Sequence, residues 1–238
     1  MKGVIVVFKR IIPLLALLLA CSFGTAHAHL RDYLVTQGYW TLPQGRFEIE
    51  IYNDFNEADS GETVYTHQTE IEYGLTDRLT LALYGVMEKK GAKPLEYAKT
   101  KFEGKYRLAE PGRMIVDPTL YIEYQKGANN RADKVEAKLL LSKDFSNNMN
   151  ITFNGILEKS RQAGSEWEKG YAAGIARVIS RNLTTGFEIK STGSKRYAIP
   201  GVYMTLVPGK VRMNVGTAFG LTEKSDDFQL KMLTEIEF

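Results

Sequence analysis

The amino-acid sequence predicts an all-β protein: a closed, antiparallel, up-and-down transmembrane β-barrel of about twelve strands. Three observations predict this fold. Apolar and polar residues alternate with a period of two along most of the chain after residue 45, tight turns alternate with longer charged loops, and the chain stops in mid-strand on Phe238. A soluble β-sandwich also alternates, but its strands usually have about 5–6 residues, and most segments here are longer.

The first 28 residues predict export from the cytoplasm. Three basic residues within residues 2–10 precede the apolar run Ile11–Ala20, and a small-residue cleavage site ends at Ala28. The alternative is a lipoprotein-like cleavage box, in which the chain is cut before Cys21. If cleavage follows Ala28, the only cysteine leaves with the signal peptide, and the mature chain has no thiol or disulfide chemistry.

The mature chain is electrically balanced. The sequence has 31 Lys and Arg against 28 Asp and Glu, and residues 1–28 carry three of these bases and no acid, which leaves 28 of each. This balance gives no reason to expect a nucleic-acid partner. We expect a signal peptide at 1–28, a periplasmic lead-in at 29–44 and one barrel domain at 45–238. Because no long apolar stretch follows residue 30, the mature chain could span a membrane only as a barrel.

The predicted strands follow one another to the end of the chain. The first two alternate apolar residues with glutamates, the third follows the turn Gly74–Asp77, the fourth alternates with lysines, and the last has apolar residues at every second position. Pro200 interrupts the tenth strand and predicts a bulge or a shifted strand start there. The predicted strands are Phe47–Ile51, Thr69–Tyr73, Leu79–Tyr84, Ala98–Leu108, Val116–Tyr124, Val135–Leu141, Met149–Leu157, Gly170–Ile179, Leu183–Ile189, Tyr197–Leu206, Val211–Leu221 and Phe228–Phe238.

The connections alternate in length, which is typical of periplasmic turns and extracellular loops. The expected tight turns are Gly74–Asp77, Ala109–Met114, Phe145–Asn148, Ser180–Asn182 and Val207–Lys210. The expected longer loops are Asn53–Glu62, Glu88–Leu95, Lys126–Arg131, Lys159–Trp167, Ser191–Lys195 and Thr222–Asp227. Both termini then lie in the periplasm. Aromatic residues near the strand ends are expected to mark the two membrane interfaces, Tyr73, Tyr106, Phe145 and Phe238 at one and Phe55, Tyr65, Tyr124 and Tyr171 at the other.

The alternation also predicts which charges face the lumen. Acids are dense on the first two strands and bases on the fourth, so we expect one acidic and one basic wall. The charges either line a narrow pore or pair across the lumen and fill it, and twelve strands permit both. The predicted lumen-lining charges are Glu48, Glu50, Glu70, Glu72, Arg78, Lys99, Lys101, Glu103, Lys105, Arg107, Glu123, Glu136, Lys138, Glu188, Lys190, Arg212, Lys231 and Glu235.

The sequence predicts no catalytic, cofactor-binding or metal-binding residues. His67 falls on the outward face of the second strand, where a lipid-acting enzyme would need a base. No serine accompanies it, so an interfacial histidine of the aromatic girdle is the preferred interpretation. His29 could bind copper or zinc as a new N-terminal residue, but no second histidine lies nearby in the sequence.

Several sequence segments resemble segments of known proteins. Thr69–Leu81 resembles the repeated hairpin phrase of transporter-like barrels, with weaker echoes at Ser180–Thr184 and Phe145–Met149. The closing strand Phe228–Phe238 resembles the C-terminal signal of bacterial outer-membrane barrels, in which Phe238 would be read by the barrel-assembly machinery. The whole mature chain resembles uncharacterised porin-like outer-membrane proteins of Gram-negative bacteria.

This resemblance implies an outer-membrane location, contacts with outer-membrane lipids, and passive transport of small polar solutes without a cofactor. In size the chain also resembles small acidic-sugar channels, whose lumen is strongly basic where this one is balanced. Two alternatives stay open: a structural or binding barrel with a closed lumen, and a lipid-acting enzyme.

Overall fold

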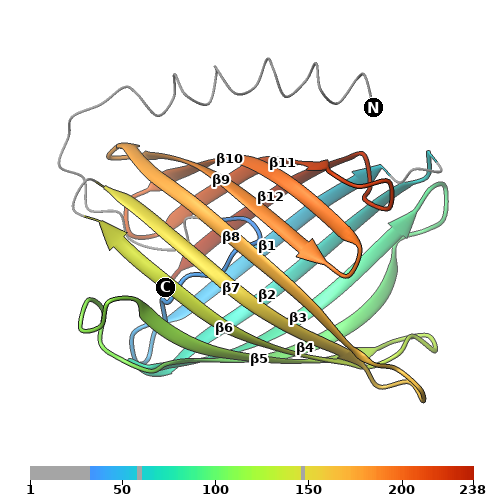
Figure 1. The fold of residues 1–238 in the computed structure, drawn as a ribbon, viewed down its shortest axis with the longest axis horizontal. Helices are drawn as coiled ribbons and strands as arrows, with labels where there is room; N and C mark the ends of the chain where they lie inside the picture. Colours follow the sequence, from blue (N-terminus) through green and yellow to red (C-terminus); the bar gives the residue numbers. More distant parts are fainter. Residues whose placement is uncertain (1–32, 58–60, 146–147) are drawn as a thin grey trace.

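The computed structural model describes residues 33–57, 61–145 and 148–238. These residues form one closed antiparallel barrel, in which each strand pairs with its neighbours in sequence and the first strand pairs with the last (Figure 1). The strands are β1 (Phe47–Glu57), β2 (Thr63–Thr76), β3 (Leu79–Lys90), β4 (Glu96–Arg107), β5 (Asp117–Gly127), β6 (Lys134–Phe145), β7 (Met149–Ser160), β8 (Trp167–Ser180), β9 (Leu183–Thr192), β10 (Lys195–Val207), β11 (Val211–Gly220) and β12 (Phe228–Glu237). The predicted all-β fold, its closure and its strand number are confirmed. The predicted signal peptide lies outside the described residues.

The barrel has its apolar side chains outside and its charges inside. On the outer wall Phe102 is 52% exposed and Ile122 is 59% exposed, whereas Glu70 and Glu188 on the inner wall are 0% exposed. A soluble β-sandwich places these two classes the other way round. No helix among the described residues is long and apolar enough to cross a membrane.

We call the end that holds Phe47 and Phe238 the turn end, and the opposite end the loop end. The N–H of Phe238 donates to the carbonyl oxygen of Phe47 at 2.9 Å, so the last residue takes part in closing the barrel. Aromatic pairs mark the two ends of the paired strands β1 and β2, with Phe47 tilted against Tyr73 at the turn end and Phe55 stacked on Tyr65 at the loop end. Eight residues separate the pairs along β1, or about 20 Å along the barrel axis for a tilted strand.

Several boundaries differ from the sequence prediction. β1 continues to Glu57 and β2 begins at Thr63, because the ladder extends through segments that read as a charged loop. The predicted loop Ser191–Lys195 is a tight turn, since the strands run to Thr192 and resume at Lys195 with Gly193 at φ +55°. The predicted tight turn Ala109–Met114 is instead part of the longer connection between β4 and β5. At Pro200 the register with β11 does not change, and pairing is only interrupted between Ala198 and Gly201.

Candidate functional site

Residues 33–46, which we call the lumen segment, run inside the barrel before β1 starts. Tyr33, Thr36 and Tyr39 are almost fully buried, and the segment hydrogen-bonds to inward side chains of β3, β5, β6, β7 and β9. In Figure 1 the blue chain that precedes β1 passes among the strands. The part of the predicted lead-in that the structure describes therefore occupies the lumen.

Glu188 on β9 holds the start of the lumen segment. Its carboxylate accepts the N–H groups of Leu34 at 2.7 Å, Val35 at 2.9 Å and Thr36 at 2.6 Å. Tyr203 on β10 donates its hydroxyl to the same carboxylate at 3.1 Å. Hydrogen bonds to an ionised group are roughly twice as strong as neutral ones, so this carboxylate is the strongest single anchor of the segment.

Hydrogen bonds to side chains of the barrel wall also hold the rest of the lumen segment. Asn154 on β7 accepts the Gln37 N–H at 2.7 Å and donates to the Gln37 carbonyl oxygen at 2.8 Å, as a neighbouring strand would. Lys138 donates to the Gln37 side chain at 3.0 Å. Tyr39 donates to Asp144 at 2.7 Å, and its carbonyl accepts the hydroxyl of Thr119 at 3.1 Å. These partners lie far from the segment in sequence, so only the closed barrel brings them together.

The inner wall is hollowed where the segment packs. A Cβ at Gly174 would lie 2.3 Å from the Tyr33 ring, and one at Gly216 would lie 2.4 Å from Leu34 Cδ1. A larger residue at either position would force the Tyr33 ring or the Leu34 side chain to shift. Tyr33 and Leu34 also join a buried apolar cluster that includes Leu233. The wall is therefore complementary in shape to the segment as well as in hydrogen bonding.

Two cavities border the lumen segment, and no residue lines both of them. The turn-end cavity has a volume of about 570 Å³ and touches the segment at residues 40–43 and at Arg46. The loop-end cavity has a volume of about 240 Å³ and touches the segment at Leu34, Val35 and Gln37. Opposite the segment, Tyr52 and Tyr84 line the loop-end cavity and donate their hydroxyls to Glu50 and Glu103, respectively. A tyrosine–glutamate layer and the lumen segment therefore lie between the two cavities.

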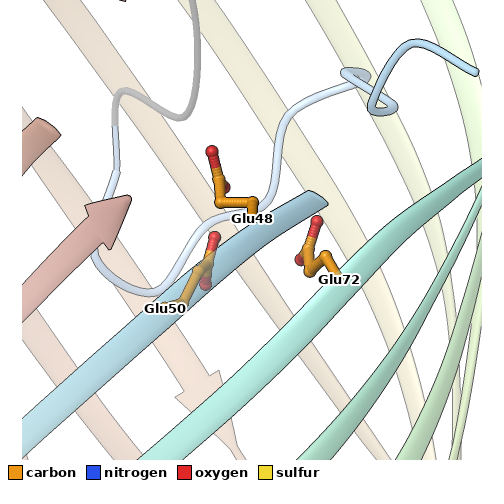
Figure 2. Close-up of side chains that lie close together, drawn as sticks. All are labelled: Glu48, Glu50 and Glu72. Carbon is orange, nitrogen blue, oxygen red and sulfur yellow. The ribbon is translucent and has the colours of Figure 1, made fainter. Parts of the chain in front are cut away.

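Buried carboxyl groups gather beside the turn-end cavity. Figure 2 shows Glu48, Glu50 and Glu72, which come from β1 and β2 and bring one oxygen each within 4.8 Å of the others. Glu72 forms a second such group with Glu70 and Glu103. Register causes this crowding, because Glu48 lies opposite Glu72 and Glu50 opposite Glu70.

An arginine lies beside this acidic group, and the carboxylate oxygens of the group are possible cation ligands. Arg212 on β11 partly offsets its charge, at 3.5 Å from Glu48 and 3.1 Å from Glu235. Carboxylate oxygens are the ligands that hard divalent cations prefer, so among the residues that the structure describes these are the ones that could hold such a cation.

The loop-end cavity contains ion pairs with one additional lysine. Its four lining carboxylates each contact a lysine: Asp54 with Lys231 at 2.7 Å, Glu123 with Lys101 at 3.3 Å, Glu136 with Lys138 at 2.8 Å, and Glu158 with Lys134 at 2.6 Å. Within the described parts of the chain, the ammonium group of Lys190 has no hydrogen bond or ion pair and lines the cavity. Lys134 does not line the cavity, so the lining carries four carboxylates and four lysines, and among the described residues Lys190 is the lining lysine without an ion pair.

The remaining predicted lumen residues lie in different environments. Arg78 is in the β2–β3 turn and pairs with Glu110 at 2.7 Å, at the turn end rather than along the wall. Arg107 is buried and donates to the Asp77 carbonyl oxygen, and Lys99 donates to Gln125 at 3.2 Å. The uncharged residues that hold the lumen segment, such as Asn154 and Thr119, were missed because only charges were considered. Their alternation with outward apolar residues was the available signal.

His67 lies on the outer wall, as the alternation predicted. Its ring contacts Asn53 on β1 at 3.0 Å and Thr69 on β2 at 3.1 Å. Asn53 was missed because it fell in a predicted loop.

Comparison with known proteins gives the fold. No protein-family model and no curated protein matches the chain. An outer-membrane channel from Pseudomonas putida F1 shares 14% identity, with 84% of this chain and 98% of that chain covered, at a TM-score of 0.60. The KdgM porin shares 8% identity, with 80% of this chain and 99% of that chain covered, at a TM-score of 0.62. The NanC porin shares 8% identity, with 80% of this chain and 98% of that chain covered, at a TM-score of 0.55. The chain is therefore similar in structure to porin-like outer-membrane barrels, as the sequence predicted.

Proposed function

We propose that this protein is an outer-membrane channel for the passive passage of small polar solutes, and that the lumen segment closes it in the conformation described here. The observation that carries the proposal is the pair of charged cavities along one lumen, inside a barrel whose outer wall is apolar. Such a wall suits lipid outside and water inside. The similarity to channels and porins supports the same function.

The connections favour one orientation in the membrane. The turn end carries the two-residue turns 77–78 and 181–182 beside one long connection, 108–116. The loop end carries one two-residue turn, 193–194, and longer connections such as 128–133, 161–166 and 221–227. Short periplasmic turns and longer extracellular loops are the usual arrangement of these barrels. We therefore place the loop-end cavity toward the cell exterior and the turn-end cavity toward the periplasm.

Movement of the lumen segment would join the two cavities into one path. The segment lies against both cavities and is held by hydrogen bonds and packing, which can open and close. The ladder begins at Phe47, so the segment can leave without breaking a strand. The expected solutes are small because the loop-end cavity holds only about 240 Å³.

The fit of the segment favours a second candidate function, a barrel with a permanently closed lumen that binds a ligand or partner. The segment packs closely against Gly174 and Gly216 and hydrogen-bonds to Glu188, and such contacts suit a fixed structural element equally well.

Conductance in planar lipid bilayers distinguishes the two functions. The mature chain from residue 29 is compared with a variant that lacks residues 33–44, which keeps the backbone contacts of Gly45 and Arg46 with Gly74. A channel closed by the segment gives rare steps in the parent and frequent, larger steps in the variant. If both proteins are folded and neither conducts, the closed-lumen function replaces the channel.

A further inference from the structure

Three polar side chains form a hydrogen-bonded chain on the outer wall, near the loop end. The Nδ1 atom of His67 lies 3.0 Å from Oδ1 of Asn53, and Nε2 lies 3.1 Å from Oγ1 of Thr69. Asn53 lies opposite His67 in the β1–β2 register, and Thr69 follows two residues after His67 on the same face. A hydroxyl, an imidazole and an orienting amide in this order are the arrangement of a nucleophile, a general base and its positioning group.

The hydrogen bonds fix which imidazole nitrogen carries the proton. Oδ1 of Asn53 can only accept, and it also accepts the hydroxyl of Tyr65 at 2.7 Å. Nδ1 of His67 therefore donates to Asn53, and in the neutral ring Nε2 is left as an acceptor. The Thr69 hydroxyl then donates to Nε2, which is the state that a base needs before it takes a proton.

The residues around the trio place it at the level expected for lipid esters. On the loop side of it the Phe55 and Tyr65 rings stack at 4.7 Å, as aromatic rings do at a membrane interface. On the turn side the same outer face continues with Ile51 and with Ile71, which is 49% exposed. The boundary between an aromatic belt and an aliphatic band corresponds to the boundary between lipid head groups and acyl chains.

The wall beside Thr69 leaves room for a substrate. Gly85 on β3 lies directly opposite Thr69, and a Cβ placed on Gly85 would meet nothing within 4 Å. The outer surface beside Thr69 is therefore open, and both residues are exposed on the outside of the barrel.

We propose that Thr69, His67 and Asn53 form an acyl-transfer site that hydrolyses the carboxylic ester of a membrane glycerolipid. Thr69 is the nucleophile, His67 is the general acid and base, and Asn53 positions the ring. Ionisable side chains are rare on lipid-facing surfaces and usually have a function there, and ester hydrolysis at the interface is such a function. The site is separate from the lumen and does not depend on the channel function.

The reaction balances with water as its only co-reactant. Oγ1 of Thr69 attacks the acyl carbon while its proton passes to Nε2 of His67. The bond from the acyl carbon to the glycerol oxygen then breaks, and that oxygen takes the proton, which leaves an acyl ester on Thr69 and a lysolipid. Water attacks this ester and gives a proton to Nε2, the bond to Oγ1 breaks, and Thr69 recovers its proton as the fatty acid leaves.

The test uses the refolded mature chain in detergent micelles with a short-chain diacyl phosphatidylcholine. The matched ether-linked lipid, which lacks the ester, is the substrate control. Release of fatty acid is followed by mass spectrometry, and hexadecylsulfonyl fluoride, which reacts with an activated hydroxyl, is mapped to its site by peptide mass spectrometry. Heat-modifiable mobility in gels confirms that every variant is folded.

We expect slow release from the ester lipid, none from the ether lipid, and a sulfonyl adduct on Thr69. His67→Ala should lower the rate by about 10²–10⁴-fold, as loss of a general base does. Thr69→Ala should abolish the adduct, whereas Thr69→Ser should raise the rate because a primary hydroxyl is less hindered. Thr185→Ala, which removes an outward threonine from β9, should leave the rate unchanged.

Positioning by Asn53 has its own readout. Asn53→Ala should lower kcat and leave KM unchanged, and Asn53→Asp should restore kcat because its carboxylate also accepts from Nδ1. The proposal is overturned if folded parent and Thr69→Ser proteins release no fatty acid and take no sulfonyl group at residue 69. It is also overturned if Thr69→Ala keeps the parent's rate.

Discussion

The Glu188→Ala substitution tests whether hydrogen bonds hold the lumen segment in place. The carboxylate accepts three backbone N–H groups of the segment and the hydroxyl of Tyr203. A hydrogen bond to a charged group contributes about 1.5–3 kcal/mol, and such bonds to one acceptor are not additive. We expect the substitution to weaken docking of the segment by about 3–4 kcal/mol, which corresponds to roughly 10²–10³-fold in the ratio of closed to open forms.

A thiol placed in the segment measures this change. The mature chain from residue 29 has no cysteine, so Thr36→Cys introduces a single thiol at a side chain that is 0% exposed. A water-soluble maleimide labels this thiol only when the segment leaves the wall. The labelling rate should rise by roughly 10²–10³-fold in Glu188→Ala, in proportion to the open form.

A matched control separates docking from a general effect of charge. Glu168→Ala removes an exposed acid at the loop end of β8 and should leave the labelling rate of Thr36→Cys unchanged. If the barrel is folded and Glu188→Ala labels no faster than the parent, the carboxylate does not anchor the segment, and the reasoning is refuted.

Three further predictions address the loop-end cavity, a loop and the chain end. Lys190→Glu should shift ion selectivity toward cations, because it replaces a positive charge that has no ion-pair partner in the described residues with a negative one. Reversal potentials under a salt gradient measure the selectivity. A shift no larger than that of the exposed control Lys89→Glu would contradict the prediction. Burial by itself would raise the pKa of Asp226, but hydrogen bonds from Lys195 and Gln229 outweigh it and hold the pKa below its usual range. The ionised form therefore stabilises this loop above the ordinary pKa of about 3.9. That stabilisation is lost as the pH falls through the folded value. Hydrogen exchange of residues 221–227 should thus be faster in Asp226→Asn than in the parent at pH 7, and the difference should shrink as the pH falls below the ordinary pKa of about 3.9. Equal exchange at pH 7 would refute the assignment. Deletion of Phe238 should reduce the yield of heat-modifiable barrel in cells more than it does in refolding with detergent, and equal losses would show that the residue acts only by closing the barrel.

The fold was predictable because its signal is local. A strand that separates lipid from an interior shows a period of two in its own sequence, and segments such as Leu79–Tyr84 and Phe228–Phe238 carried that period without knowledge of their partners. Strand ends were less predictable. Asn53–Glu57 is polar because it lies at the loop end of the wall, and its polarity resembled that of a loop.

The sites depend on tertiary structure, since their members are far apart in sequence. Leu34 and Glu188 are 154 residues apart, and residues 33–46 carry no period that could assign them to the lumen. Alternation predicted that these charged side chains point inward, but the ion pairs that they form depend on strand register and barrel closure. The sequence therefore could not show that Lys190 has no ion-pair partner among the described residues. The sequence by itself determined which residues face inward or outward, because that depends on single strands. Only the closed barrel decided which of them meet, because contact across strands depends on how all twelve are placed around one axis.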